Sequence, residues 1–268
     1  LLPLVQQGEP AMKATVLGCG PSSGVPMIGN DWGTCDPNNP KNRRRRPSVL
    51  VEKGETAIVV DTSPDLRQQS LDAGIMRLDA VLYTHEHADH INGIDEIRVI
   101  RRLTGHNIDA FAAPHVLDVL TSRFGYLFSG HSEEGHLYRP VLNPKPFTGP
   151  FSVGEIDVVP FEQNHGICTS YGFRMGNFAY STDVADLSDE AFATLDGVHT
   201  WVVDCLRIGK LHPTHANLET SLNWIARLKP ERAVLTHMNH QADYEKLRAI
   251  LPEGIEPAYD GMVIKIDD

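Results

Sequence analysis

The sequence predicts a layered fold of the α/β (α+β) class, and two features of its residue pattern support this. Short apolar runs rich in β-branched residues recur along the chain, most with Gly, Pro, Asp or Asn close by, as is typical of strands. Segments whose apolar residues recur with the helical period lie between clusters of these runs. Such clusters build sheets that helices cover, and 268 residues are enough to bury a core.

The runs expected to form strands share strand length and β-branched side chains. They are Ala14–Leu17, Val49–Val51, Ala57–Val60, Ala80–Tyr83, Ile156–Pro160, Tyr171–Met175, Phe178–Tyr180, Trp201–Asp204, Ala233–Thr236 and Met262–Ile266. The segments expected to form helices are Asp65–Ala73, Ile94–Leu103, His115–Phe124, Ser188–Leu195, Leu218–Leu228 and Tyr244–Leu251. Asn217 directly precedes one of them and suits an N-cap, because its side chain can accept a hydrogen bond from the first turn.

The composition excludes several classes of protein. About half of the residues are apolar when glycine is counted, which excludes a disordered chain. With 24 basic and 35 acidic residues the formal charge is −11, which argues against polynucleotide binding but leaves a small phosphate-bearing substrate open. The four cysteines, Cys19, Cys35, Cys168 and Cys205, lack CxxC spacing and indicate buried free thiols in a reducing compartment.

The ends of the sequence lead to an expectation about organisation. No run of about 18 apolar residues predicts a membrane helix. Leu1–Pro10 lacks the basic and apolar regions of a signal peptide. We therefore expect a cytoplasmic protein in which residues 1–12 are an N-terminal extension or tag-like segment and residues 13–268 form a single domain.

Three histidines and one aspartate follow directly after the expected strand Ala80–Tyr83. They are His85, His87, Asp89 and His90. Imidazole nitrogen and carboxylate oxygen are the ligands of zinc and similar divalent ions. Because a loop at a strand end can turn all four side chains to one side, the pattern predicts a metal site.

Further ligand-type residues follow later strands. His165, Asp183 and His237 each lie just past an expected strand. The full set is too large for one ion and mixes aspartate with histidine, which favours two ions with open positions for water over a closed structural site. A sequence echo between Asp79–His85 and Arg232–His237 is either chance or a sign of two related halves.

This set of residues resembles the metallo-β-lactamase superfamily over about residues 14–266. The resemblance implies a four-layer αββα sandwich and two divalent ions, Zn²⁺ or Mn²⁺. The ligand sets that it implies are His85, His87 and His165 for one ion and Asp89, His90 and His237 for the other, with Asp183 bridging. Asp61, at the end of a strand, would orient a ligand rather than bind metal.

Finer similarity points to one branch of the superfamily. Asp183 stands where β-lactamases usually carry cysteine. The stretches that resemble the branch of PhnP-like cyclic ribose phosphodiesterases, to which tRNase Z is related, are Gly18–Pro26, Arg43–Ser48, Thr236–Gln241 and Tyr259–Met262. His215, in His-Ala-Asn-Leu, is similar to the histidine with which the phosphodiesterases contact phosphate and assist the leaving group.

The resemblance implies a metal-dependent hydrolase of a small phosphodiester, cyclic or linear, or of a nucleotide (a phosphoric diester hydrolase). A metal-bridging hydroxide would attack phosphorus, with Asp89 as a catalytic ligand and His215 as the proton donor. Ser22 and Ser23, in the first glycine-bearing loop, are candidate substrate-binding residues together with His215, although a tight turn explains the glycines as well.

Two alternative functions stay open at this point. One is a thioester or lactone hydrolase of the same fold, because fold does not determine substrate. The other is a non-catalytic carrier that resembles pyrroloquinoline-quinone biosynthesis protein B. The expected partners are a small substrate and a second copy in a homodimer, without a membrane or a polynucleotide.

Relatives in this branch carry an additional structural zinc bound by closely spaced cysteines and a histidine. By alignment, only Cys35 and His240 remain here, with Asn30 and Trp32 at cysteine positions, so we predict no third structural zinc. Trp32 is expected to pack against neighbours or to wall the pocket.

Several basic residues have no settled role. The run Arg43–Arg46 is either a solvated loop or a patch near an anionic substrate, and His212 either joins the site or flanks it. The histidines without an assigned role are His106, His115, His131, His136 and His199.

Overall fold

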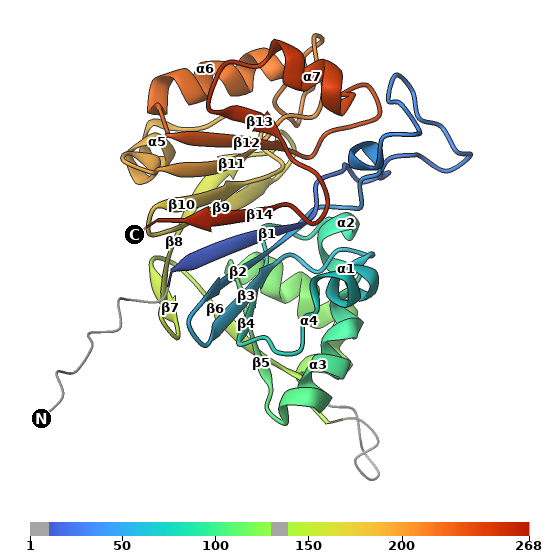
Figure 1. Cartoon of the computed structure of the whole chain (residues 1–268). Helices are drawn as coiled ribbons and strands as arrows, with labels where there is room; N and C mark the ends of the chain where they lie inside the picture. Colours follow the sequence, from blue (N-terminus) through green and yellow to red (C-terminus); the bar gives the residue numbers. More distant parts are fainter. Residues whose placement is uncertain (1–10, 130–138, 268) are drawn as a thin grey trace, which may run out of the picture.

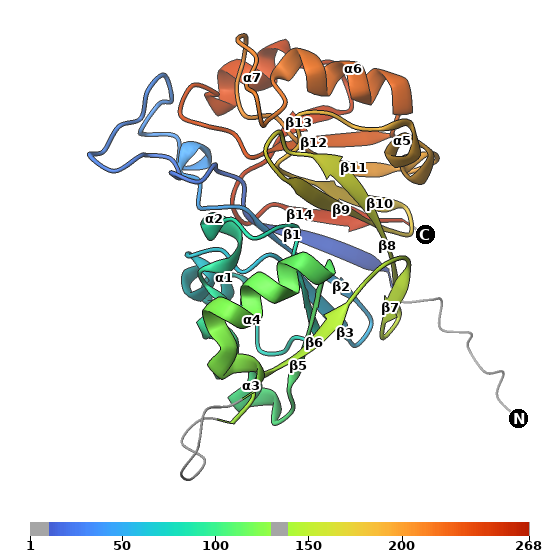
Figure 2. The same cartoon turned by 180° about the vertical axis from the view of Figure 1, so that it is seen from behind.

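Two seven-stranded sheets lie face to face, and helices cover the outer face of each (Figure 1). The computed structural model describes residues 11–129 and 139–267. Seen from behind, α1 to α4 lie on the lower half and α5 to α7 on the upper half (Figure 2). The predicted four-layer αββα sandwich is confirmed.

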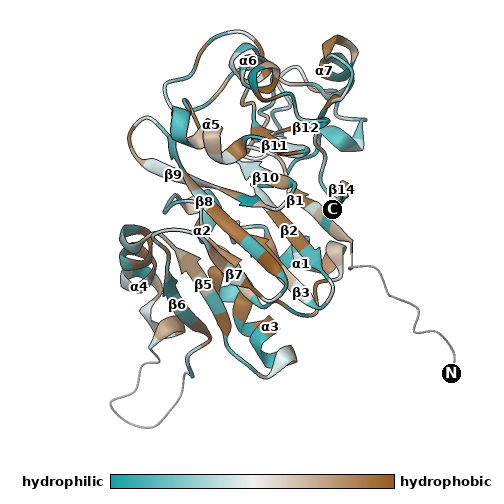
Figure 3. Cartoon of the chain, turned by 90° about the vertical axis from the view of Figure 1, so that its left-hand side faces the viewer, coloured by the Kyte–Doolittle hydropathy of each residue, from teal (hydrophilic) through white to brown (hydrophobic). Residues whose placement is uncertain are grey.

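Both sheets contain antiparallel and parallel strand pairs. The first sheet has the order β14 (Val263–Ile266), β1 (Met12–Gly18), β2 (Ser48–Lys53), β3 (Thr56–Val60), β4 (Ala80–Leu82), β5 (Ile108–Ala112) and β6 (Leu142–Pro146). The second has the order β13 (Ile255–Pro257), β12 (Arg232–Thr236), β11 (Thr200–Asp204), β10 (Phe178–Ser181), β9 (Thr169–Met175), β8 (Ile156–Asn164) and β7 (Phe151–Val153). Hydrophobic residues, coloured brown, lie along β2 and β8 (Figure 3). Residues of both sheets contribute to one hydrophobic core.

The helices follow the strands that they cover. They are α1 (Leu66–Ala73), α2 (Ala88–Ile91), α3 (Ile97–Thr104), α4 (Pro114–Phe128), α5 (Asp189–Leu195), α6 (Leu218–Leu228) and α7 (Tyr244–Ile250), with short 3₁₀ turns at Pro40–Asn42 and Ile94–Glu96. The predicted N-cap of α6 is confirmed, because the Asn217 side chain accepts from the backbone N–H of Thr220 at 2.9 Å.

The expected elements agree with the observed ones to within a few residues at their ends. The expected helix Ile94–Leu103 begins as a 3₁₀ turn before α3, and α4 extends to Phe128. The sequence reading missed β5, β6, β7 and β13. Strand β6 was not predicted because it contains Pro144 and Pro146, which disfavour a strand. It tolerates both prolines because it is the edge strand of its sheet.

The start of the chain differs slightly from the predicted boundary. Met12, assigned to the extension, is the first residue of β1 and pairs with Ile266 of β14. Residues 1–10 lie outside the described residues. The division into an extension and a single domain stays a prediction.

The two sheets share one topological plan. In each, a run of antiparallel strands is followed by three parallel pairs, which begin at β3 in the first sheet and at β10 in the second. By this plan β4 corresponds to β11, not to β12. The sequence echo, which joins β4 to β12, therefore connects strands that are not equivalent, although each is followed by a metal-type histidine.

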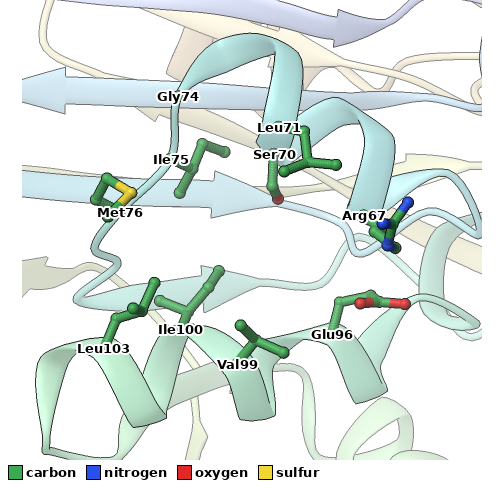
Figure 4. A pocket seen from close by; sticks show the side chains of 10 residues that line it. All are labelled: Arg67, Ser70, Leu71, Gly74, Ile75, Met76, Glu96, Val99, Ile100 and Leu103. Atoms are coloured by element: carbon green, nitrogen blue, oxygen red, sulfur yellow. The ribbon is translucent and has the colours of Figure 1, made fainter.

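The surface between α1 and α3 is an apolar groove of about 360 Å³ (Figure 4). Leu71 and Met76 lie on one wall and Val99 and Leu103 on the other, and each is more than half exposed. Of the two helices that form the groove, α1 precedes and α3 follows the metal-type residues of the first sheet.

Gly93 closes the turn after the ligand-bearing helix α2. Its φ of −91° is open to any residue, but a Cβ there would overlap the backbone oxygen of Ser63. We predict that Gly93→Ala lowers the free energy of unfolding by about 1–3 kcal/mol, because the backbone must shift to make room.

Gly125→Ala is the matched control, because its Cβ would enter open space in α4 and should raise the free energy of unfolding by about 0.5–1 kcal/mol. Urea denaturation measures both variants. Equal stabilities would contradict the steric account.

Candidate metal centre

The metal-type residues lie at the carboxyl ends of neighbouring strands. His85 follows β4, Asp183 follows β10 and His237 follows β12. His165 comes from the turn between β8 and β9, and α2 presents His90. Carboxyl ends of parallel strands meet at one edge of a sheet, so residues far apart in sequence converge there.

Three groups of candidate ligands have donor atoms within 4.8 Å of one another, and the predicted ligands fill two of them, while the third joins Asp204 and His215 to Asp183 and His237. The first is His85, His87, His165 and Asp183, and the second is Asp89, His90, Asp183 and His237. All predicted metal ligands are in these groups, and Asp183 belongs to both. Its Oδ1 lies 3.1 Å from His90 Nε2, and its Oδ2 lies 3.4 Å from His165 Nε2.

The donor atoms fit a bound metal. The Nε2 atoms of His85 and His90 and both ring nitrogens of His237 are buried without a hydrogen-bond partner. Buried polar atoms normally have a partner, so nitrogen atoms that converge on a carboxylate without a hydrogen bond are suited to bind a cation. Imidazole and carboxylate donors suit zinc or manganese equally.

Strained backbone marks the same positions. Asp61, Asp183 and His237 have φ values of 63°, 54° and 60°. Side chains other than glycine rarely adopt this left-handed region, which is held only where the surroundings determine it. Asp61 and His237 directly follow a strand and Asp183 comes one residue later, so the chain turns sharply at these strand ends.

Asp61 holds two of the ligand histidines in place. Its carboxylate accepts from the backbone N–H and the hydroxyl of Thr84 at 2.9 and 2.8 Å, and from His90 Nδ1 at 2.6 Å. The Thr84 hydroxyl in turn accepts from His85 Nδ1 at 2.9 Å. With the proton on Nδ1, each Nε2 has a lone pair that faces the cavity, which is the orienting role expected of Asp61.

The charges of the cluster depend strongly on one another. Burial raises the pKa of Asp183, but His237 and His90 outweigh it and hold that pKa well below its ordinary value. Burial lowers the pKa of His90, but Asp183, Asp89 and Asp61 raise it well above. Burial and the neighbouring His90 lower the pKa of His85. The site therefore favours negative carboxylates and attracts cations.

Asp204 is a functional residue that the sequence reading missed. Its Oδ2 accepts from His215 Nδ1 at 3.0 Å and from the Val184 N–H at 3.0 Å. Burial lowers the pKa of His215, but the charge and hydrogen bond of Asp204 raise it to about 9. One signal in the sequence could have found it. Asp204 is the last residue of the expected strand Trp201–Asp204, and Asp61 and Asp183 likewise lie at or just past the ends of expected strands.

His215 Nε2 points toward the shared carboxylate, 3.9 Å from Asp183 Oδ2. The His215 ring stacks on that of His237 with centroids 4.6 Å apart. His212 flanks this pair, because its Nδ1 accepts from the Thr214 backbone N–H and its ring centroid is 5.3 Å from that of His215. His215 is thus next to both metal groups.

Ser22 and Ser23 are exposed in the first loop. Ser23 Oγ donates to the neighbouring Gly24 carbonyl, and within the described residues no hydrogen bond links either serine to the metal groups. Their substrate-binding role stays a prediction.

The basic run is not a solvated loop throughout. The Arg44 side chain is buried, whereas Arg45 pairs with Asp72 at 2.6 Å. The guanidinium of Arg43 lies 5.0 Å from the Trp32 ring, so Trp32 packs against a cation.

The region expected to lack a structural zinc contains Cys35 and His240. Cys35 Sγ accepts from Arg44 Nη1 at 3.9 Å. Within residues 11–129 and 139–267, neither Cys35 nor His240 belongs to a group of three or more candidate ligands. The predicted absence of a third zinc stays a prediction that this packing supports.

Among the described residues, His106, His115 and His199 belong to none of the groups of candidate metal ligands. His106 and His115 are exposed, and His199 Nδ1 is 3.9 Å from Glu231. His131 and His136 lie outside the described residues.

Residues 56–238 match the family described as the beta-lactamase superfamily domain, and they make up more than half of the chain. The chain belongs to the metallo-β-lactamase superfamily. A crystal structure of "a new diphosphatase from the PhnP family" is 33% identical, covers 95% of this chain and 97% of its own, and has a TM-score of 0.87. Zn²⁺-bound PqqB of Methylobacterium extorquens is 18% identical over 95% of this chain and 100% of its own with a TM-score of 0.74, a likeness of fold alone.

Two curated relatives are longer than the matched segment. A protein named octanoyltransferase from Porphyromonas gingivalis is 34% identical over 96% of this chain and 52% of its own length. Ribonuclease Z of Bradyrhizobium sp. (strain ORS 278) is 34% identical over 50% of this chain and 45% of its own. The chain thus spans about half the length of the curated relatives it matches. No helix among the described residues is long and apolar enough to cross a membrane.

The two-group geometry predicts separable losses of metal. Asp89 belongs only to the second group, so Asp89→Ala should keep one ion per chain and lose the other together with activity. His87→Ala, in the first group only, is the matched variant and should also keep one. Elemental analysis after gel filtration measures this, and two ions retained in both variants would contradict the assignment.

Proposed function

We propose that the protein is a binuclear metal-dependent phosphodiesterase that hydrolyses a small phosphodiester, cyclic or linear, or a nucleotide. The single observation that carries the proposal is the His215–Asp204 pair beside the two metal groups. The similarity to a PhnP-family diphosphatase over nearly the whole chain supports it. Two zinc or manganese ions, when bound, supply an activated water and neutralise developing negative charge.

The residues of the chain supply the remaining parts of the reaction. His85, His87 and His165 would hold one ion and Asp89, His90 and His237 the other, and Asp183, which belongs to both groups, could serve either. Protonated His215 offers its Nε2 proton to the leaving oxygen, while its Nδ1 stays bonded to Asp204. A cationic imidazole also suits an anionic phosphodiester, which the formal charge of −11 otherwise repels.

The same acidic charge supports a small substrate over a polynucleotide. The match to ribonuclease Z covers half of the chain, and RNA is the competing substrate class in the test below. A homodimer, a cytoplasmic location and the choice between zinc and manganese are proposals from the sequence.

The test is hydrolysis of bis(p-nitrophenyl) phosphate by protein loaded with Zn²⁺ or Mn²⁺. We expect metal-dependent turnover that a chelator abolishes, and slower cleavage of a transfer-RNA precursor. Absence of turnover in metal-loaded protein that binds a phosphodiester tightly would contradict catalysis and favour the carrier.

An acyl ester or thioester hydrolase is the second candidate. The observation that favours it is the match of the whole chain to half of a protein named octanoyltransferase. Its test is hydrolysis of an octanoyl thioester by the same metal-loaded protein. Thioester cleavage that is faster than phosphodiester cleavage would replace the first proposal by the second.

His215→Ala should retain both ions and lose about 10²–10⁴-fold in kcat, because the proton donor is removed. The loss should be large for an alkyl leaving group and small for p-nitrophenolate, which leaves without a proton. His212→Ala is the matched control, because the His212 side chain makes no hydrogen bond to Asp204 in the structure. Equal losses for both leaving groups would exclude proton donation by His215.

The rate should fall as the pH rises through the pKa of His215, because the proton donor is lost. That pKa is about 9 with Asp204 in place, and bound cations act in the opposite direction. Asp204→Asn removes the charge that raises the pKa, so its descending limb should move to lower pH. The pH dependence of kcat measures this, and an unchanged limb would contradict the role of Asp204.

A further inference from the structure

His237 is held differently from three of the other metal-facing histidines, while His87 bonds through its Nδ1 to His165 Nε2 at 3.3 Å. The Nδ1 atoms of His85, His90 and His165 bond to the Thr84 hydroxyl, the Asp61 carboxylate and the Thr214 carbonyl, respectively. Neither ring nitrogen of His237 makes a hydrogen bond to the described residues. The orientation of the His237 ring therefore depends on ring stacking against His215 and on the backbone that carries it.

That backbone is strained and needs support. His237 has a φ of 60°, in the left-handed region, which persists only where surrounding contacts hold it. The Met238 N–H donates to the Cys19 carbonyl at 2.9 Å, and the Asn239 N–H donates to the Leu206 carbonyl at 2.9 Å. Carbonyl groups of the loop are bonded as well: the Asn239 carbonyl accepts from the Ala242 N–H at 3.1 Å, and the His240 carbonyl accepts from the Thr34 N–H at 2.9 Å.

The guanidinium of Arg44, whose residue is 2% exposed, belongs to the side chain that binds three carbonyl groups around this loop. Its Nη1 donates to the Asn239 carbonyl at 3.1 Å and the Met238 carbonyl at 3.5 Å. Its Nη2 donates to the Ala242 carbonyl at 2.6 Å. Arg44 thus binds the loop directly after His237 through hydrogen bonds. It lies almost 200 residues earlier in the sequence.

The remaining contacts of Arg44 are also to uncharged groups. They are the Asn42 side-chain oxygen at 3.3 Å and the Cys35 sulfur at 3.9 Å. Within the described residues no carboxylate pairs with Arg44. A buried cation without an anion costs free energy of desolvation, so its bonds to the loop carbonyls do more for geometry than for stability.

We propose that Arg44 is a positioning residue that sets the affinity for the metal ion of the Asp89, His90 and His237 group by fixing the His237 loop. This inference rests on the proposed binuclear site. The group of His85, His87 and His165 has no contact with Arg44 among the described residues, so its ion should be unaffected.

The test is a chelator titration of zinc-loaded protein, in which the loss of each ion is followed separately. Arg44→Met should weaken binding of the second-group ion by about 10–100-fold and leave the first-group ion unchanged, as removal of orienting partners does at metal sites. Arg45→Met, in which the neighbouring guanidinium loses an exposed pair with Asp72, is the matched control and should leave both affinities unchanged.

Arg44→Lys keeps the charge but cannot reach all the carbonyl groups, so it should show a smaller loss at the same ion. This variant decides the matter if Arg44→Met fails to fold. A thermal unfolding temperature that falls while both zinc affinities stay at wild-type values would overturn the inference. Wild-type protein that binds only one ion would instead overturn the proposed binuclear function.

Discussion

The carboxylate of Asp183 is the interaction on which the rest of the site depends. It is buried, lies 3.1 Å from His90 Nε2 and 3.2 Å from His237 Nε2 through Oδ1, and faces His165 through Oδ2. Several buried imidazole nitrogens face this carboxylate without a hydrogen-bond partner, an arrangement that fits cations held between them. The strand ends, the strained backbone at Asp61 and His237, and the bonds of Asp61 all serve to keep these groups together.

The two sheets share one plan, but each supplies different parts of the site. The first sheet contributes most ligands through the turn after β4 and through α2, and Asp61 orients them. The second contributes Asp183, His237 and the Asp204–His215 pair. The family match over residues 56–238 places the chain in its superfamily, and the Asp204–His215 pair is what favours the proposed phosphodiester among the substrates that this fold accepts.

Much of this could be predicted from the sequence, because the informative signals are local. Histidines spaced closely after a buried strand identify a ligand loop, and His165, Asp183 and His237 are recognisable by their places after strands. What could not be predicted depends on contacts between distant segments. Asp204 is one of many acidic residues until His215 is seen beside it, and Arg44 belongs to a basic run until its side chain is found buried against the His237 loop. The proline-containing edge strand β6 was missed because local propensity opposes it.

The most direct measurement of the central claim is anomalous diffraction from crystals of the zinc-loaded protein. The account predicts two zinc peaks, one among His85, His87 and His165 and the other among Asp89, His90 and His237, with the Asp183 carboxylate between them. A single peak, or a second peak outside these two groups, would contradict it.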